Sequence, residues 1–154
     1  MSPDMTDKIS IPLQFSDEIL SLHPPSVVWP VLANFADYSN WWPKYLFVSI
    51  LHSEPNLIGT EFVIRPYGWR SFLCRVTSFE EPSCICLQYD SNYMRGTAEW
   101  RLEPVKQGTK VIYEMDAVVN DIIVYLVSYI TSLQSIHSYS MRGVLQNLTK
   151  QLSA

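Results

Sequence analysis

His137 is the side chain of this sequence with the clearest potential for chemistry. It lies four residues after Leu133 and four before Met141, on the apolar stripe of a predicted helix. An imidazole in this place can bond a ligand oxygen or act as a general acid or base near neutral pH. The position also suits a histidine at the edge of the stripe that bonds to a backbone carbonyl or to water.

Two tyrosines and a cysteine are the next candidates, all on the inner face of predicted strands. The hydroxyls of Tyr89 and Tyr113 can orient the polar head of a ligand or lie at the rim of a site. Cys74 would act as a nucleophile only with a nearby base and a lowered pKa. We therefore expect Cys74 to be a small buried hydrophobic residue.

Cys84 and Cys86 form a C-x-C pattern, whose two thiols would share one face of a strand. A metal site would need two more ligands, and no further histidine or cysteine is close in the sequence. We therefore expect two ordinary strand cysteines, no metal site and no cofactor. The three cysteines of the chain, an odd number, suit a reducing compartment.

The chain shows no pattern typical of export or of membrane insertion. Residues 1–8 are polar and acidic and lack the basic and then apolar pattern of a signal peptide. The longest apolar region, residues 122–133, is shorter than the roughly 20 residues that a membrane-spanning helix needs. We expect a cytoplasmic protein in which residues 1–10 are flexible.

The composition combines many aromatic rings with few charges. Of 154 residues, five are Trp, nine Tyr and six Phe, and only 17% are charged, against about 25% in an average soluble domain. This excludes a disordered chain, and the length predicts one domain, residues 1–154, with a sizeable core. A net charge of −4 disfavours nucleic acid as a partner. The rings must then fill a solid core or line a cavity.

The elements that must position the candidates begin with a strand and two short helices. Residues 11–22 are typical of a strand, which a pair of prolines ends. A short helix is expected over residues 27–33, with Ser26 as its cap. A second short helix or turn is expected over residues 37–42.

Residues 48–119 alternate apolar and polar side chains between glycine, proline and asparagine turns, which predicts a meander of antiparallel strands. Pairing that keeps the apolar faces together puts Val76 opposite Leu87 and Cys74 opposite Tyr89. The opposite face suits solvent, so the apolar face needs a cover. The six expected strands are 48–53, 60–66, 70–79, 84–90, 94–103 and 109–119.

One long helix over residues 121–152 is expected to supply that cover. Nothing interrupts it except Gly143, and apolar residues recur along it at helical spacing. Asn120 is expected to cap it, with Asp121 in its first turn. Its start, residues 122–125, is apolar all round, which suggests burial under loops or a contact in a dimer.

Several short motifs accompany this order of elements: PSVVWPVLANFADY (25–38), WWP (41–43), GTEF (59–62), CRVTSFEEP (74–82), GTAEWRLEP (96–104) and GTKVIYE (108–114). Together they resemble the START-like superfamily, which includes polyketide cyclase/dehydrase-type proteins and the pollen-allergen fold, over about residues 13–150. The resemblance implies an α+β, helix-grip fold. In it, a curved antiparallel sheet of about seven strands wraps around a long C-terminal helix, with two short helices after the first strand.

The fold implied by this resemblance leaves a cavity between sheet and helix, in which family members hold lipids, sterols, quinones, polyketides or hormones. Apolar walls with a few polar groups are typical of small-molecule sites. The alternative is that the side chains meet and close the space. Leu126 is also expected in the wall. The expected ligand-binding residues are Phe62, Ile64, Phe72, Cys74, Leu87, Tyr89, Trp100, Tyr113, Met115, Tyr129, Leu133, His137 and Met141.

Three functions are compatible with such a cavity. The first is binding, or transport, of a small hydrophobic ligand such as a lipid, a quinone or a polyketide. The second is a cyclase/aromatase-type enzyme in which His137, Tyr89 and Tyr113 handle protons or orient an oxyanion. The third is a module that binds other proteins and has a vestigial cavity.

The charged residues favour binding over catalysis. An aromatase-type cyclase needs groups that stabilise an enolate and move protons, often with an arginine in the cavity. No carboxylate is assigned to the inner face, and no residue is assigned as catalytic. The outward charges are Glu61, Arg65, Arg75, Glu99, Arg101 and Glu114, while Arg70 and Arg95 lie near strand ends and Arg142 lies off the centre of the helical stripe.

Aromatic residues outside the strands are expected at the ends of the cavity, where they can gate it or seal the core. Exposed rings at an opening can also touch a membrane surface transiently. The expected partner is a small hydrophobic molecule, and the chain is expected to be a monomer or a homodimer. These rings are Trp41, Trp42, Tyr45, Phe47, Tyr67 and Trp69.

Overall fold

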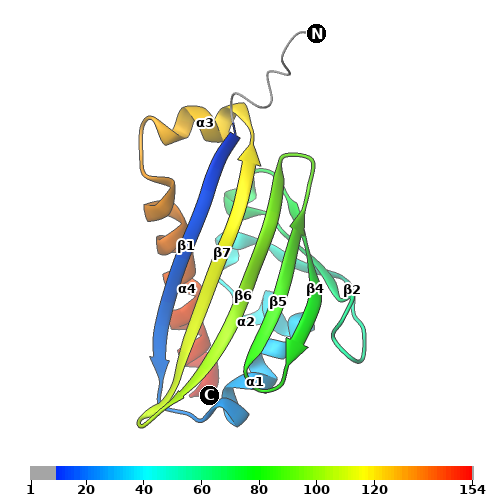
Figure 1. Cartoon of the computed structure of the whole chain (residues 1–154), viewed down its shortest axis with the longest axis vertical. Helices are drawn as coiled ribbons and strands as arrows, with labels where there is room; N and C mark the ends of the chain where they lie inside the picture. The colour runs from blue at the N-terminus through cyan, green and yellow to red at the C-terminus, as the bar shows by residue number, and fades with distance from the viewer. Residues whose placement is uncertain (1–9, 154) are drawn as a thin grey trace.

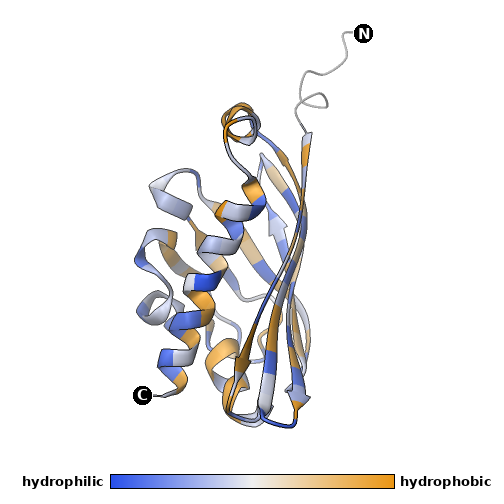
Figure 2. Ribbon diagram, turned by 90° about the vertical axis from the view of Figure 1, so that its left-hand side faces the viewer, coloured by the Kyte–Doolittle hydropathy of each residue, from blue (hydrophilic) through white to orange (hydrophobic). Residues whose placement is uncertain are grey.

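A computed structural model of the chain, which describes residues 10–153, contains a seven-stranded antiparallel sheet in the order β1-β7-β6-β5-β4-β3-β2. Helices cover one face of this sheet (Figures 1 and 2). The strands are β1 (Ser10–Ser21), β2 (Val48–His52), β3 (Glu61–Ile64), β4 (Phe72–Glu80), β5 (Cys84–Asp90), β6 (Met94–Val105) and β7 (Gly108–Asn120). The helices are α1 (Pro25–Ala33), η2 (Phe35–Asp37), α2 (Tyr38–Trp41), η3 (Lys44–Leu46), η4 (Pro66–Gly68), α3 (Ile122–Ser128) and α4 (Leu133–Leu152).

This architecture confirms the expected α+β, helix-grip arrangement, with two differences at its start. The expected flexible segment, residues 1–10, lies outside the described residues except for Ser10, which begins β1. The first helix begins at Pro25, and Pro24 rather than Ser26 is its N-cap residue. Proline is well suited to the first helical position because its missing N–H would have no partner there.

The strand register confirms the pairing expected from the apolar faces. Cys74 lies opposite Tyr89, Val76 opposite Leu87, and Leu87 opposite Ala98. All of these residues are buried and share the inward face. The register of β4 and β5 shifts after Val76, so that Phe79 pairs with the buried Ile85.

The expectation of one long helix over residues 121–152 is wrong. The structure has two helices separated by a turn: α3 ends at Ser128 and α4 begins at Leu133. The hydroxyl of Ser132 accepts a hydrogen bond from the backbone N–H of Ser135 at 3.2 Å and so caps α4. Serine and threonine side chains offer the backbone such alternative bonds and favour caps over helix interiors. The apolar spacing continues across the break and therefore concealed it.

The break gives the two helices different places on the sheet. α4 runs along the concave face, whereas α3 crosses the end of the sheet where β7 finishes (Figure 1). Asp121, not Asn120, caps α3, because its Oδ1 accepts from the backbone N–H groups of Ile123 at 2.8 Å and Val124 at 3.1 Å. These bonds satisfy two of the free N–H groups at the helix start.

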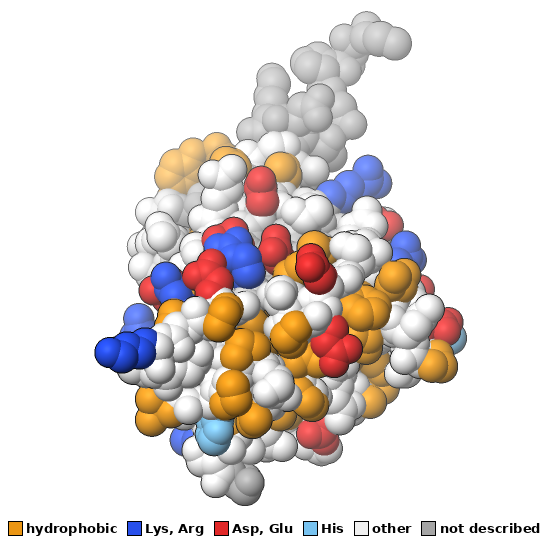
Figure 3. Space-filling view, turned by 60° about the horizontal axis from the view of Figure 1, so that its bottom comes forward, with side chains coloured by type: hydrophobic (Ala, Val, Ile, Leu, Met, Phe, Trp, Pro, Cys, Tyr) orange, Lys and Arg blue, Asp and Glu red, His pale blue; other side chains and the backbone are white. Residues whose placement is uncertain are grey.

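One half of the concave face is solidly packed, and we call it the packed half. There α1, α2 and the C-terminal part of α4 contact one another, while α1 also contacts β6 and β7. Figure 3 views the molecule from this end and shows apolar side chains gathered on its surface. The buried residues that define the packed half are Val28, Leu32, Phe35, Tyr38, Phe62, Ile85, Leu87, Trp100, Val144 and Leu148.

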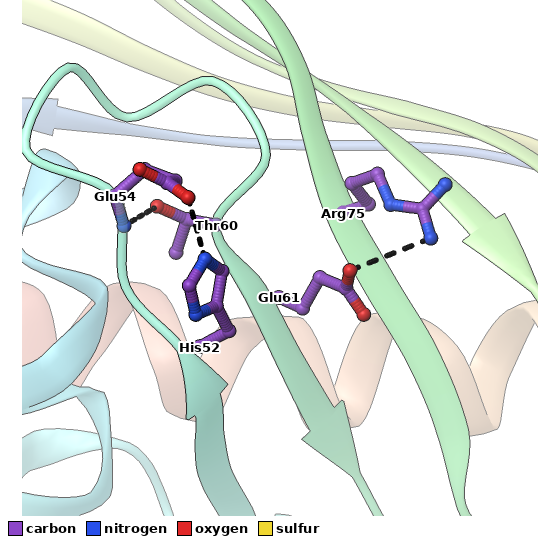
Figure 4. Close-up of polar contacts among 5 residues, drawn as sticks. All are labelled: His52, Glu54, Thr60, Glu61 and Arg75. Atoms are coloured by element: carbon purple, nitrogen blue, oxygen red, sulfur yellow. Dashed lines mark hydrogen bonds and ion pairs between the residues drawn. The ribbon is translucent and has the colours of Figure 1, made fainter.

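The convex face carries the mixed-sign charges that the alternation predicts. Arg101 lies 2.9 Å from Glu114, and Arg75 lies 3.5 Å from its strand partner Glu61 (Figure 4). Figure 4 also shows the neighbouring loop, in which the carboxylate of Glu54 lies 2.5 Å from His52. Exposed pairs of this kind contribute only about 0–1 kcal/mol each, so the stability of the sheet comes from its concave face.

Candidate functional site

A cavity of about 420 Å³ lies at the other half of the concave face, beneath α3 and the N-terminal part of α4; we call this the hollow half. The volume falls within the range of about 300–1,000 Å³ that is typical of small-molecule sites. Its wall is almost entirely apolar. The lining residues are Leu13, Phe15, Trp42, Leu46, Ile64, Pro66, Tyr67, Trp69, Phe72, Tyr89, Tyr93, Met94, Tyr113, Met115, Val119, Ile123, Val124, Val127, Leu133, Ile136, His137, Ser140 and Met141.

The structure brings a group of the expected ligand-binding residues together in this wall. They come from β3, β4, β5, β7 and α4, which are separated by up to about half of the chain but converge on one space. The strand residues reach the wall because alternate side chains point to the same face of the sheet. The members of this group are Ile64, Phe72, Tyr89, Tyr113, Met115, Leu133, His137 and Met141.

Four expected wall residues are buried on the correct face but lie outside the cavity wall: Phe62, Cys74, Leu87 and Trp100. Phe62, for example, stacks on Phe35 with ring centroids 5.2 Å apart. Alternation shows which face a side chain occupies, but not how far along the strand the covering helices extend. Burial raises the pKa of the Cys74 thiol well above its usual value, which is the opposite of what a nucleophile needs.

The expectation that Tyr129 and Leu126 line the cavity is wrong. Tyr129 is 74% exposed and Leu126 is 52% exposed. Both errors follow from the helix break, because α3 turns away from the line of α4 and presents a different face. Val124 and Val127 of α3 lie in the wall instead.

Some wall residues were not among the expected ligand-binding residues. Leu13 and Phe15 of β1 lie in the wall, and their alternation with polar neighbours is a signal that could have found them. Tyr67 and Trp69, expected near an opening, also line the cavity and are partly exposed. Of the two adjacent tryptophans expected at a cavity end, only Trp42 is in the wall.

Hydroxyl groups provide most of the polar atoms in the wall. The hydroxyls of Tyr89 and Tyr113 are in hydrogen-bond contact. Burial raises the pKa of Tyr113 well above its usual value, so the Tyr113 hydroxyl stays protonated. Nearer the opening, the Tyr67 hydroxyl lies 2.8 Å from Ser140 Oγ, which donates to the carbonyl of Ile136 at 3.0 Å.

Asp17 is a carboxylate on the inner face, where the sequence analysis assigned none. Its Oδ2 lies 3.5 Å from Nδ1 of His137, and the two side chains are only 15% and 19% exposed. The nearby His137 lowers the pKa of Asp17 against the opposing effect of burial, and Ser138 and Arg142 lower it further. The expected absence of inward charge is therefore wrong.

A second buried carboxylate, Asp121, forms an ion pair at the rim of the cavity. Arg70 lies 2.7 Å from it and also lies over the rings of Trp69 and Tyr93, at 5.5 and 5.8 Å from their centroids. Burial is the main cause that raises the pKa of Tyr93 to about 12. Because Asp121 also caps α3, this contact fastens that helix to the aromatic rim.

The described residues contain no group of three or more His, Cys, Asp or Glu side chains that could hold a metal ion. Cys84 and Cys86 are partly exposed free cysteines on the outer face of β5. Within residues 10–153, no helix is long and apolar enough to cross a membrane.

A comparison of the sequence with models of protein families finds a match. A family model described as "Polyketide cyclase / dehydrase and lipid transport" matches residues 13–151. A search of curated protein sequences found no match.

Solved structures with the same fold share little sequence with the chain. An uncharacterised protein from Rhizobium leguminosarum superposes with a TM-score of 0.68 at 11% identity, covering 94% of this chain and 96% of its own. Norcoclaurine synthase from Thalictrum flavum, solved with dopamine and hydroxybenzaldehyde, gives 0.67 at 8% identity, covering 99% and 93%. The di-domain ARO/CYC StfQ of the steffimycin biosynthetic pathway gives 0.70 at 11% identity, covering 93% of this chain and 51% of StfQ. At these identities the likeness shows the fold alone.

Proposed function

The chain belongs to the polyketide cyclase / dehydrase and lipid transport family, and on that premise we propose that it binds a small hydrophobic molecule in the cavity of the hollow half. The observation that carries the proposal is the cavity of about 420 Å³ with an almost wholly apolar wall. Candidate ligands are a lipid, a quinone or a polyketide. The proposed ligand contacts are the expected residues that lie in the cavity wall: Ile64, Phe72, Tyr89, Tyr113, Met115, Leu133, His137 and Met141.

The energetics of the wall support a ligand as the natural filling. Apolar side chains around an empty space lose the dispersion contacts that close packing would provide. A bound apolar molecule restores these contacts and removes apolar surface from water. Because it binds only the folded chain, it also stabilises that chain, by about 2.7 kcal/mol at a concentration of 100 times Kd.

The rim suggests how a ligand is delivered. Exposed apolar side chains lie on α3 and in the turn after it, including Ile122 at 52% and Ile130 at 85%. Other residues of α3 share the cavity wall with the partly exposed rings of Tyr67 and Trp69. We include in the proposal transient contact of this rim with a membrane surface, one domain, a cytoplasmic location, and a monomer or homodimer.

A cyclase/dehydratase-type enzyme is the second candidate. The specific observation in its favour is that His137 and the Tyr89–Tyr113 pair lie in the wall of the same cavity. For this candidate, His137→Ala should abolish turnover of a poly-β-ketone without unfolding the protein. Unchanged turnover in the variant would remove His137 from the mechanism.

Native mass spectrometry of the purified protein, with extraction of any bound molecule and a panel of lipids, quinones and flavonoids, tests the proposal. Ile136→Trp should fill the cavity from α4 and abolish binding, because Ile136 lies in the wall. Ser135→Trp, one residue away on the exposed side of α4, is the matched control and should bind normally. Wild-type protein that arrives empty and binds no member of the panel would contradict the proposal.

A further inference from the structure

The Asp17–His137 pair gives the apolar cavity one directional polar group. His137 lies in the wall, and its Nδ1 lies 3.5 Å from Asp17 Oδ2. Both atoms are buried, and neither has a hydrogen-bond partner within residues 10–153. The contact between them, at ion-pair distance, is therefore the polar contact that orients Nδ1 of His137.

Stacking fixes the orientation of the imidazole ring. The ring of Phe15 lies against it with centroids 4.2 Å apart and an interplanar angle of 16°, and the ring of Tyr113 lies 6.0 Å away at 21°. With Nδ1 turned to Asp17, the other nitrogen, Nε2, is the one left for a ligand. No described residue makes a hydrogen bond to Nε2.

The carboxylate also decides which nitrogen carries the proton. His137 lowers the pKa of Asp17, so Asp17 is ionised at neutral pH and can only accept hydrogen bonds. A neutral imidazole beside it therefore carries its hydrogen on Nδ1 and keeps a lone pair on Nε2. In this tautomer the free nitrogen, Nε2, is a hydrogen-bond acceptor.

We propose that the cavity selects hydrophobic ligands that carry a hydroxyl able to donate a hydrogen bond to Nε2 of His137, as a phenol or an enol does. This inference rests on the proposed binding function and adds the chemical class of the ligand. A ligand without a donor leaves Nε2 unpaired, and an unpaired polar group away from water weakens binding. The Tyr89 and Tyr113 hydroxyls already share a hydrogen bond, whereas Nε2 of His137 has no partner among the described residues and is the acceptor on which the selectivity is proposed to depend.

A matched pair of two-ring probes tests this selectivity: 2-naphthol, which donates a hydrogen bond, and 2-methoxynaphthalene, which does not. Wild-type protein should bind 2-naphthol about tenfold more tightly, as measured by isothermal titration calorimetry. Equal Kd values for the two probes would overturn the inference and leave the proposed function intact. Wild-type protein that binds neither probe would contradict both. Ile136→Trp should abolish binding of both probes, which locates them in the cavity.

His137→Phe keeps a ring that can stack on Phe15 but removes the acceptor. The variant should lose the preference for 2-naphthol, so that its Kd values for the two probes become equal, and circular dichroism checks that it is folded. A preference retained in this variant would overturn the inference.

Asp17 is a positioning residue, and its test needs a readout that a merely structural role would not change. In the wild type, side-chain ¹⁵N NMR should show Nε2 of His137 unprotonated. Asp17→Asn should move the hydrogen to Nε2, because an amide can donate to Nδ1, and should remove the preference for 2-naphthol. A wild-type spectrum with the hydrogen on Nε2 would overturn the inference.

Discussion

The packed half and the hollow half of the concave face are built from the same strands with the same alternation, yet only one is solid. In the packed half, Trp100 of β6 and Leu148 of α4 are 1% exposed, and α1 contacts both of these elements. In the hollow half, Phe72 and Met115 point to the same face but meet a cavity. The difference lies in the cover, since α3 and one part of α4 do not fill the space that the sheet encloses.

The aromatic residues divide along the same line. In the packed half, Tyr38 donates a hydrogen bond to the carbonyl of Leu32 at 2.5 Å, and its ring packs edge-on against Trp41, with centroids 5.2 Å apart. In the hollow half, Tyr89 and Tyr113 have their hydroxyls paired beside open space. The excess of rings in the composition therefore serves a solid core and a cavity wall at once.

The largest expected effect on stability comes from comparing two leucines of α4, one in each half. Leu148→Ala removes a fully buried side chain from the packed half and should lower the free energy of unfolding by about 3 kcal/mol. Leu133→Ala makes the same change in the cavity wall and should cost about 1 kcal/mol, since part of its surface already faces open space. Urea denaturation measures both. Equal losses would show that the two halves are equally packed.

Asp121→Ala tests whether the cover of the hollow half depends on its cap. The variant removes two hydrogen bonds to the start of α3 and the partner of Arg70, and should cost about 2 kcal/mol. Hydrogen exchange should speed up at the amides of Ile123 and Val124 but not in the packed half. Asp116→Ala, on the exposed face of β7, is the control and should change neither. Uniformly faster exchange would contradict a local role.

The tyrosine pair offers a smaller and more specific test of the hollow half. Tyr89→Phe leaves the buried Tyr113 hydroxyl without its partner and should cost about 1 kcal/mol. Replacing both tyrosines with phenylalanine should cost less than twice this amount, because neither hydroxyl is then left unpaired. Thermal unfolding of the two single variants and the double variant measures the coupling. Additive losses would show that the hydroxyls do not interact.

The smallest expected effect is the pH dependence of stability that Asp17 causes. The pKa of Asp17 is lowered in the folded state, so its ionised form stabilises the fold at pH values above the unfolded pKa. This contribution is lost as pH falls through the lower, folded value. Wild-type protein should therefore be more stable than Asp17→Asn at neutral pH, and the gap should close on acidification below pH about 4. Thermal unfolding across this range measures it, and a gap that widens would contradict the sign.

Most of the sheet was predictable from the sequence because alternation constrains it strongly. The pairing of Cys74 with Tyr89 and of Val76 with Leu87 followed from keeping apolar faces together. The inward position of Asp17 follows from the same rule, since it shares a face with Phe15 and Ile19. It was missed because the alternation was followed over residues 48–119 and not over the strand expected at residues 11–22.

The extent of the cavity was not predictable, because it depends on contacts between distant segments. The alternation of side chains along the strands could not distinguish Trp100, which is buried in the packed half, from Tyr113, which borders the cavity. The helix break could not be found from apolar spacing, because α3 ends at Ser128 and Ser132 caps α4 without interrupting the apolar stripe.

The division of the cover into two helices has a kinetic consequence. α3 is only seven residues long and has no buried residue, whereas a helix of that length is not stable by itself in water. It can therefore open on its own, many times, while the packed half stays folded. Exchange of the proposed ligand would then follow the opening rate of α3 and not the lifetime of the native state, so a slowly unfolding protein could still release such a molecule quickly.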